Sequence, residues 1–448
     1  MKKIAGGSAG FTIAELLVSM LIVSIMMGAI FASFTTLTSS FKVQTKTAES
    51  QIEDVLSLEL LRYDLESAGY GLPEGTGGGA CSTIAAYSEY PTGFTPTGNT
   101  NYTPNQYTPD PATDFNDSTS SCEPRPIVLD HNTNPTPSNS NGSDVLVIKS
   151  ITADRTAVTK KWTMLDNAGH FIVWNDLKWD LCGNANGNAG CAAGLNERAI
   201  AVSSTRQLIS GGFQFSTLPA APAPGQSYII YGVNSTTNLR MPFNRVDYYL
   251  QRPCSSQLGT CTGTPPQHPY PLQCHPSGYT LYRAVLSHSN GQRVEQPIMD
   301  CVIDFQVALG VDTGCTDTLG NGCTGTLTWC RFTNLTSNPG SATPCNSASD
   351  AGCTADPCRT AICQNNTSYC LNNAQNIRTS LKQVKVFVLT HEGKIDPNFT
   401  YANNSIAIGD SDITLKTYDL TTLANYARYR WKLQKINVKL NSLGGNYE

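Results

Sequence analysis

Among the residue types of this chain that can carry chemistry, cysteine is the most informative. The sequence has 16 cysteines in 448 residues, and nine of them fall in the 70-residue stretch 301–370. The C-x₂-C pairs of zinc sites and the C-x-x-C-H of covalent haem attachment are both absent from the sequence. Dense cysteines without such spacing are typical of disulfides in an oxidising compartment outside the cytoplasm. The candidate disulfide cysteines are Cys81, Cys122, Cys182, Cys191, Cys254, Cys261, Cys274, Cys301, Cys315, Cys323, Cys330, Cys345, Cys353, Cys358, Cys363 and Cys370.

The pairing of these cysteines is only partly constrained by their positions. Nine is an odd number, so one cysteine of the stretch 301–370 must pair outside it or stay free, and we expect Cys274 to be the outside partner. The remaining connectivity stays open, because sequence alone does not give disulfide partners. The plausible local pairs are Cys81–Cys122, Cys182–Cys191 and Cys254–Cys261.

The sequence contains no recognisable catalytic motif. G-x-S-x-G, H-E-x-x-H, the P-loop and G-x-G-x-x-G are absent, and the six histidines are scattered. Asp130, Asn132 and Asn134 match the D-x-N-x-N opening of a calcium loop, but Pro135 stands where glycine is needed and no glutamate follows at position twelve. An Asn-rich turn is therefore favoured over calcium, and we expect no metal, no cofactor and no enzymatic activity.

Charge argues against a nucleic-acid partner. The formal net charge is −4, and charged residues make up 14% of the chain. Nucleic-acid binding needs Lys and Arg clustered on one basic face, and no such block occurs.

The residues near the N-terminus predict a membrane helix. No charged residue occurs from Leu16 to Phe34, and a helix that begins at Phe11 crosses a hydrocarbon core of about 30 Å with roughly 20 residues. Lys2 and Lys3 on its N-terminal flank predict that this end stays in the cytoplasm while the rest lies outside. Small residues precede the apolar run, so a cut after Gly10 leaves that run on the mature protein, unlike a secretory signal peptide.

Glu15 lies inside this apolar stretch, where an ionised carboxylate costs roughly 2.5–3.5 kcal/mol. One explanation is that Glu15 is close to the helix end and reaches the interface. The other requires cleavage at Gly10, which frees the amine of Phe11 as a cation to neutralise the carboxylate, in the same chain or in a neighbour displaced along a filament. We favour the second explanation.

The run G-F-T-x-x-E-L-L-V-S at Gly10–Ser19 resembles the class III signal of type IV pilins and type II secretion pseudopilins. The resemblance implies that a membrane peptidase cuts after Gly10 and that the new N-terminal Phe11 is methylated. It also implies that Glu15 takes part in assembly.

A single helix of about 58 residues, on the order of 87 Å long, is predicted from Phe11 onward. No proline interrupts it before Leu72, and Gly69, Gly71 and Pro73 supply its end. The expected apolar face consists of Ala48, Ile52, Val55, Leu58, Leu61, Leu65 and Ala68, widened by Leu56, Leu60 and Tyr63.

The turn D-x-x-x-A-G-Y within Tyr63–Pro73 resembles the PilW-like minor pilins, and the J-type pseudopilins have a related N-terminal half. The resemblance implies an α+β fold, a pilin-like lollipop in which an antiparallel β-sheet head covers the second half of the helix. Many major pilins carry a proline in the membrane helix, and its absence here favours a minor subunit.

The chain is expected to divide into a leader (1–10), an assembly helix (11–73), a low-complexity loop rich in Gly, Ser, Thr, Pro and Asn (74–142), a β-rich head (143–311), a disulfide-stapled insertion (312–372) and closing strands (373–448). The loop is either a solvated excursion or an adhesive, glycan-contacting surface. The expected strands are Val145–Ile151, Lys161–Leu165, His170–Trp174, Tyr228–Val233, Val246–Leu250, Thr280–Leu286, Pro297–Val311, Gln383–Thr390 and Lys432–Leu440.

Taken together, the sequence predicts a minor pilin that resides in the bacterial inner membrane with a periplasmic head and then enters a cell-surface filament near its tip. Its expected partners are the prepilin peptidase and other pilins, through the N-terminal helix. A pseudopilin of a type II secretion system is one alternative. A membrane-anchored adhesin or ligand-binding module is another.

Overall fold

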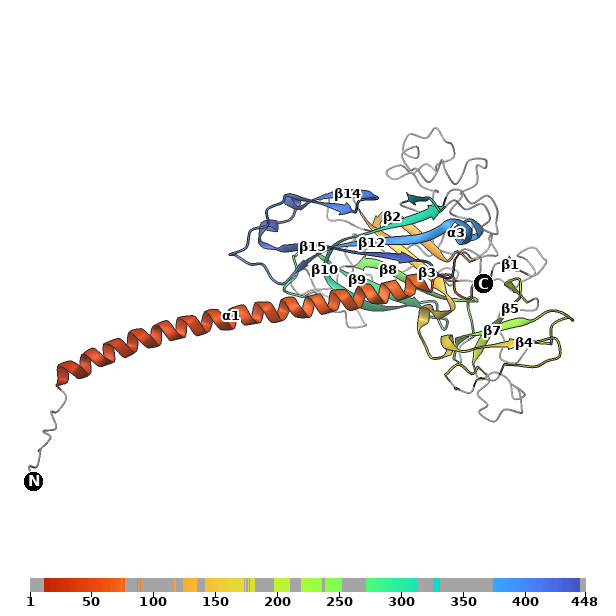
Figure 1. Cartoon of the computed structure of the whole chain (residues 1–448), viewed down its shortest axis with the longest axis horizontal. Helices are drawn as coiled ribbons and strands as arrows, with labels where there is room; N and C mark the ends of the chain where they lie inside the picture. Colours follow the sequence, from red (N-terminus) through yellow and green to blue (C-terminus); the bar gives the residue numbers. More distant parts are fainter. Residues whose placement is uncertain are drawn as a thin grey trace, which may run out of the picture. The chain divides into compact units, whose positions relative to one another are not determined.

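The computed structural model describes residues 12–73, 75–76, 87, 89, 117, 124–134, 142–172, 174, 176, 178–181, 197–209, 219–235, 238–251, 271–312, 325–330 and 374–443. The chain forms two compact units, Met1–Ile52 and Glu53–Glu448. Helix α1 (Ile13–Glu66) contributes to both units and is continuous over 54 residues. In Figure 1 it is drawn in red.

Among the described residues, the first unit contains the part of α1 up to Ile52, which begins with the apolar run. Its large apolar side chains are exposed, including Leu21, Met27 and Phe31. Its hydroxyl groups are satisfied within the helix, since Ser24 donates to the carbonyl of Met20 at 2.8 Å and others follow the same pattern. Internal pairing of polar groups together with an apolar surface suits a lipid environment.

The end of α1 follows the glycine signals of the sequence. Gly69 and Gly71 have φ of 82° and 68°, the left-handed region that favours glycine. The Gly69 N–H donates to the carbonyl of Lys149 at 2.9 Å, and the Ile151 N–H donates to the carbonyl of Tyr70 at 2.9 Å. The turn after α1 is thus hydrogen-bonded to the end of a strand of the second unit.

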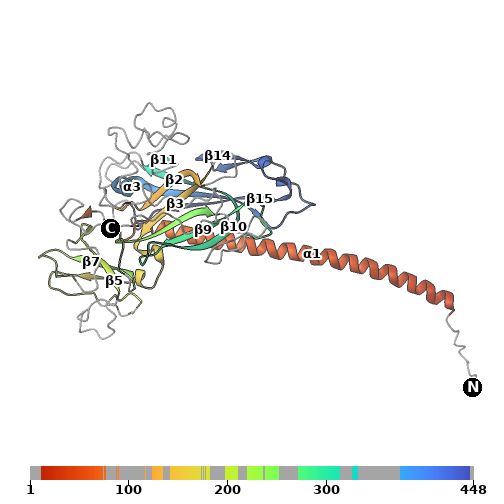
Figure 2. The same cartoon turned by 180° about the vertical axis from the view of Figure 1, so that it is seen from behind.

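The main sheet of the second unit has eight strands among the described residues, all paired antiparallel. Its order is β15-β12-β10-β9-β8-β3-β2, and β11 also pairs with β10. Figure 2 shows these strands from the opposite side to Figure 1. Their bounds are β2 Ile127–Asn134, β3 Ser143–Ser150, β8 Asn244–Gln251, β9 Tyr279–Leu286, β10 Arg293–Asp312, β11 Leu327–Cys330, β12 Leu381–Glu392 and β15 Arg430–Lys439.

Alternating side chains direct one face of this sheet toward the end of α1. Leu61 and Leu65 of the helix are fully buried in one apolar cluster with Ile148, Tyr248 and Phe305 of the strands. The opposite face is buried as well, under a separate cluster that includes residues of β3, β8 and β9. Burial on both faces explains why β3 and β8 are buried along their whole length.

A second, five-stranded sheet forms from segments that mostly lie between β3 and β8 in sequence, with order β1-β6-β5-β7-β4. All its pairings are antiparallel except the short β1–β6 pair. Its strands are β1 Gly75–Thr76, β4 Trp162–Leu165, β5 Arg198–Ser203, β6 Gln207–Leu208 and β7 Tyr228–Asn234.

Smaller elements complete the described part of the second unit. The hairpin β13–β14 packs its Ile408 and Leu415 in a cluster with Phe387 and Trp431 of the main sheet. The bounds are β13 Ser405–Gly409, β14 Thr414–Asp419, α3 Ala374–Ser380 and the 3₁₀ turns Ile151–Asp154, Val158–Lys160, Leu420–Thr422 and Tyr426–Arg428.

Most expected strands are present, each within a few residues of its predicted bounds, and the long helix is present as one element. The exception is His170–Trp174, whose described residues form only an isolated bridge, between Leu165 and Phe171.

The expected loop 74–142 and insertion 312–372 each contain a strand, and in this respect those expectations are wrong. Residues 127–134 form β2 and pair with β3, while residues 327–330 form β11 and pair with β10. Strand β11 has four residues, the second half of β2 is polar, and both strands lie beside Ser-, Thr- and Asn-rich sequence, so composition did not indicate them. Strand β5 and the hairpin β13–β14 were also not predicted.

The expected apolar face of α1 is wrong in part. Leu58, Leu61, Leu65 and Ala68 are buried, whereas the side chains of Ile52, Val55, Leu56 and Tyr63 are exposed. Asp54, Ser57 and Asp64 are buried in their place. Three positions of the helix face that packs on the sheet are therefore polar. For this reason the spacing of apolar residues in the sequence did not indicate this face.

Candidate functional site

The N-terminal end of α1 carries a reciprocal hydrogen-bonded cap. Glu15 Oε2 accepts from the Thr12 N–H and from Thr12 Oγ1, both at 3.1 Å. The Glu15 N–H in turn donates to Thr12 Oγ1 at 3.3 Å. This is the capping box T-x-x-E, in which two donors of the first turn are satisfied at once.

The capping box adds a local role to the predicted role of Glu15. A carboxylate in the first turn also interacts favourably with the positive end of the helix dipole. The sequence contains the signal for this cap, since Thr12 stands three residues before Glu15 in the pattern T-x-x-E. Gly10 and Phe11, the predicted cleavage and methylation positions, lie outside the described residues.

Of the described residues, one helix is long and apolar enough to span a membrane, and it is α1. The window that meets this criterion has no side chain covered by the rest of the chain. Length and composition therefore agree with the single N-terminal span that the sequence predicts.

At the other end of α1, Asp64 is buried within the second unit and binds three side chains. Its Oδ1 accepts from Arg155 Nε at 2.9 Å. Its Oδ2 accepts from Arg283 Nε at 2.7 Å and from the Tyr248 hydroxyl at 2.6 Å. A buried carboxylate is tolerated only when it is paired and hydrogen-bonded in this way.

The two arginines also bind backbone carbonyls beside Asp64. Arg155 Nη2 donates to the carbonyl of Leu60 at 2.9 Å, and its guanidinium lies 4.5 Å from the centre of the Tyr63 ring. Arg283 Nη2 donates to the carbonyl of Ala153 at 2.5 Å. Cations near the C-terminal end of a helix also interact favourably with its dipole. We call Asp64, Arg155, Tyr248 and Arg283 the Asp64 cluster.

The protonation of this cluster is fixed by its surroundings. Burial raises the pKa of Tyr248 well above its ordinary value, and the negative charge of Asp64 raises it further. Burial, the largest single cause, lowers the pKa of Arg283, but the charges and hydrogen bonds of Asp64 and Tyr248 together raise it, and the net direction is upward. Tyr248 therefore donates as a neutral phenol to an Asp64 carboxylate held between two cations.

A second polar position of α1 is Asp54. Its Oδ2 accepts from Gln434 Nε2 of β15 at 2.8 Å. Burial raises the pKa of Asp54 to about 6, an effect that the hydrogen bond from Gln434 and the charge of Lys432 oppose. Asp54 thus titrates close to neutral pH, unlike an ordinary surface aspartate.

Beyond the helix, a buried ionic network ties the segment 74–142 to the main sheet. Lys149 Nζ binds Glu89 Oε1 at 2.7 Å and also contacts Asp117 Oδ2. Arg245 Nη1 binds Glu89 Oε2 at 2.6 Å, and Arg125 Nε binds Asp117 Oδ1 at 2.6 Å. The side chains of Glu89 and Asp117 are thus counter-ions inside the protein. At these two positions the segment 74–142 is not a solvated loop.

The described cysteine side chains are Cys274 and Cys301, and they form a disulfide with a Cα–Cα separation of 4.8 Å. This pairing agrees with the expectation that Cys274 is the partner outside the cysteine-rich stretch. The other candidate disulfide cysteines lie outside the residues whose side chains are described, as do the predicted pairs Cys81–Cys122, Cys182–Cys191 and Cys254–Cys261.

The D-x-N-x-N run from Asp130 to Asn134 lies in strand β2, an extended conformation, whereas a calcium loop folds back around its ion. Within the described ranges, no three His, Cys, Asp or Glu side chains come together in a way that holds a metal ion.

The described chain is therefore an α+β protein with one membrane-length helix and a mostly antiparallel β region. No protein-family model, no curated protein and no solved structure matches it.

Proposed function

We propose that this chain is a minor pilin of a type IV pilus, processed by prepilin peptidase and incorporated at or near the filament tip. There it primes assembly or presents its β-rich head. The observation that carries the proposal is that the two parts of α1 have different surroundings. Its first part is apolar and uncovered, and its last turns pack on an antiparallel sheet through Leu61 and Leu65.

The hydrogen bonds at the end of α1 support the same proposal. A subunit that is pulled from a membrane into a filament by its helix needs that helix to be firmly joined to its head. The Asp64 cluster supplies such a joint, since one helical carboxylate binds Arg155 and Arg283 from two different segments of the second unit. The residues of the D-x-x-x-A-G-Y turn take part through Asp64, Gly69 and Tyr70.

Glu15 is the residue on which assembly is proposed to depend. Its two hydrogen bonds from Thr12 both fall on Oε2. We expect Oε1 to face the amine of a processed Phe11, which follows Gly10 directly in sequence. A positive amine opposite this carboxylate offsets the cost of placing Glu15 among lipid chains.

The test is mass spectrometry on filaments sheared from cells, with the membrane fraction measured alongside. We expect a peptide that begins at methylated Phe11, in trace amounts relative to the major subunit. An intact Met1 terminus in both fractions would overturn the proposal.

The same measurement identifies a pseudopilin, and a count of fibres together with an adhesion assay identifies an adhesin. Processed protein confined to membranes would indicate a pseudopilin of a type II secretion system. A membrane-anchored adhesin predicts a normal number of fibres but lost adhesion when the protein is removed from the cell, whereas a priming subunit predicts fewer fibres.

A further inference from the structure

Strand β10 has an irregular segment at residues 297–302, which we call the β10 bulge. Its pairing with β9 shifts register between Pro297 and Met299 and again between Met299 and Val302. Its pairing with β12 shifts between Val302 and Asp304. Such a shift turns backbone groups away from the neighbouring strands and makes them available to other partners.

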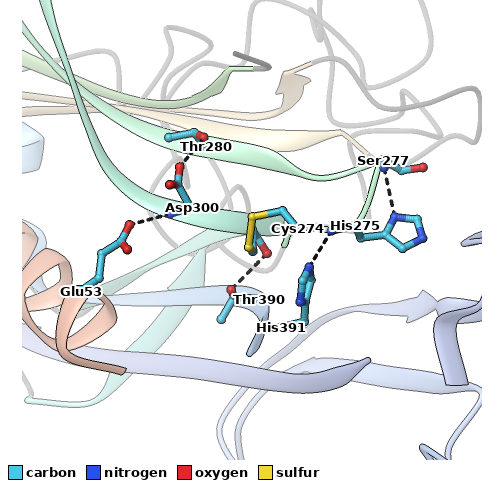
Figure 3. The surroundings of a disulfide bond; sticks show 9 residues. Glu53, Cys274, His275, Ser277, Thr280, Asp300, Thr390 and His391 are labelled. Carbon is cyan, nitrogen blue, oxygen red and sulfur yellow. Dashed lines mark hydrogen bonds between the residues drawn. A yellow bond between two sulfur atoms is a disulfide. The ribbon is translucent and has the colours of Figure 1, made fainter. Parts of the chain in front are cut away.

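Helix α1 uses the backbone groups that the bulge makes available. The Ser57 hydroxyl donates to the carbonyl of Ile298. The Asp300 N–H donates to Glu53 Oε1 at 3.1 Å, as Figure 3 shows. In a regular antiparallel ladder these groups would bond to the adjacent strand. The helix is thus hydrogen-bonded to the bulge at two positions, one turn apart.

The bulge contains a residue in an unfavourable backbone conformation. Cys301 has φ of 56°, the left-handed region that a non-glycine residue adopts only when its surroundings impose it. Two contacts impose it here. Cys301 is covalently bonded to Cys274, and its carbonyl accepts from Thr390 Oγ1 of β12 at 3.1 Å.

Cys274 lies in a loop that is fixed to the sheet by the next residue. The His275 N–H donates to His391 Nε2 of β12 at 2.8 Å (Figure 3). His275 Nε2 donates to the carbonyl of Ala424 at 2.8 Å, and its Nδ1 accepts from the Ser277 N–H at 3.0 Å. The loop therefore gives the disulfide a rigid anchor on the far side of the bulge.

The ring of His391 serves this anchor as a neutral acceptor. Burial and the neighbouring His275 together lower the pKa of His391 to about 3. At neutral pH the ring is therefore uncharged and its Nε2 can accept from the His275 N–H.

We propose that formation of the Cys274–Cys301 disulfide sets the register of the β10 bulge and thereby completes the docking of α1 at Glu53 and Ser57. Contact of α1 with the β10 bulge is then redox-dependent, since the hydrogen bonds of Glu53 and Ser57 to the bulge form only after oxidation, whereas the Asp64 cluster holds the end of the helix in either state. This inference concerns the second unit alone and does not depend on a filament role. Both cysteines are 4–5% exposed, so the bond is protected from reductants once it has formed.

The reaction is a thiol–disulfide exchange with a protein or small-molecule disulfide as oxidant. The Sγ–Sγ bond between Cys274 and Cys301 forms while the S–S bond of the oxidant breaks. The two thiols lose two electrons and two protons, both pass to the disulfide of the oxidant, and that disulfide leaves as two thiols.

The experiment is hydrogen–deuterium exchange by mass spectrometry on the full chain in detergent micelles, read on peptides that cover 297–302 and 53–61. Substitution is used in place of a reductant because a reductant would also reduce any other disulfide. In Cys274→Ser/Cys301→Ser we expect both peptides to exchange about tenfold faster or more than in the wild type.

A matched variant separates the covalent bond from the backbone conformation. Cys274→Ser/Cys301→Gly also lacks the disulfide, but glycine adopts φ of 56° without strain. The proposal expects fast exchange in this variant too. Wild-type protection in either variant would overturn it, because the bulge would then keep its register without the bond.

A third variant, Glu53→Gln/Ser57→Ala, keeps the disulfide, and it also tests the proposal if the serine variant fails to fold. We expect the bulge peptide to stay protected while the helix peptide exchanges faster. Loss of protection in the bulge to the same extent as in the disulfide-free chain would mean that the helix sets the register, contrary to the proposal.

Discussion

Arg283 Nε donates to Asp64 Oδ2 at 2.7 Å, although 219 positions separate the two residues in sequence. Asp64 is 1% exposed and lies in the last turn of α1, and Arg283 is 4% exposed on the central strand β9. The pair thus joins a helix that has the length and composition of a membrane span to the middle of the main sheet. A substitution that breaks this ion pair is the most direct test of what binds the end of α1 to the sheet.

We predict that Asp64→Asn lowers the free energy of unfolding by about 3–5 kcal/mol, because the buried guanidinium of Arg283 and the half-buried guanidinium of Arg155 lose their counter-ion. Urea denaturation of the full chain in detergent, followed by tryptophan fluorescence, measures this change. The control is Glu59→Gln, which breaks the exposed pair with Arg62 and is expected to change stability by about 0.5 kcal/mol or less. Equal effects of the two substitutions would contradict a structural role for Asp64.

Asp54 is predicted to make stability depend on pH. Its folded pKa of about 6 lies above the ordinary 3.8, so the folded chain binds more protons than the unfolded chain between these values. The contribution of Asp54 to stability is therefore complete below pH 4 and is lost as pH rises through 6.

Asp54→Asn is accordingly expected to stabilise the chain at pH 7, by up to about 3 kcal/mol, and to flatten the pH dependence between 4 and 6. The amide of asparagine keeps an oxygen that accepts from Gln434. The free energy of unfolding, measured at several pH values, tests this prediction, and the exposed Glu49→Gln is the control. An unchanged pH slope in Asp54→Asn would show that this carboxyl does not titrate near pH 6.

Gly71 is predicted to be required by its neighbours as well as by its conformation. A Cβ at this position would lie 2.5 Å from Ile151 Cγ1, a fully buried side chain. At Gly225, which also has positive φ, a Cβ would meet nothing within 4 Å.

Gly225→Ala is therefore expected to cost about 1 kcal/mol of stability from backbone strain alone. Gly71→Ala is expected to cost about 1–3 kcal/mol more, because it adds overpacking to the same strain. Melting temperatures of the two variants, measured side by side, test the difference. Equal losses would mean that Ile151 moves aside freely.

At the N-terminal end, Thr12 and Glu15 are predicted to differ in importance for assembly. Thr12→Val removes the hydroxyl of the capping box, which contributes about 1 kcal/mol to the helix end, but keeps the carboxylate. Glu15→Val removes the carboxylate that is proposed to meet the amine of Phe11.

We expect Thr12→Val to enter sheared fibres at a level close to that of the wild type, and Glu15→Val to remain in the membrane fraction. Quantitative immunoblots of both fractions give the comparison. Equal loss of the two variants from fibres would indicate that the cap, and not the charge, is what assembly requires.

Local patterns in the sequence predicted several elements well. The continuous helix, its glycine-rich end and most strands follow from periodicity, apolar runs and turn residues, each a property of neighbouring positions. Counting showed that one cysteine of the stretch 301–370 must pair outside it or stay free, and the choice of Cys274 as the partner was a further expectation that the structure bears out. By contrast, β2 escaped prediction because polar residues occupy its second half, and β11 because it has four residues beside polar, low-complexity sequence.

What the sequence indicated by itself is the helix and its membrane-length apolar part, since these depend on residues close together in the chain, and an antiparallel head, since no helical pattern separates the predicted strands. Only the tertiary structure decided which face of α1 is covered. Asp54, Ser57 and Asp64 look like solvent-facing positions until Gln434, the carbonyl of Ile298, and Arg283 are brought opposite them. A buried polar side chain is tolerated only with a partner, and here each partner lies more than 200 residues away along the chain.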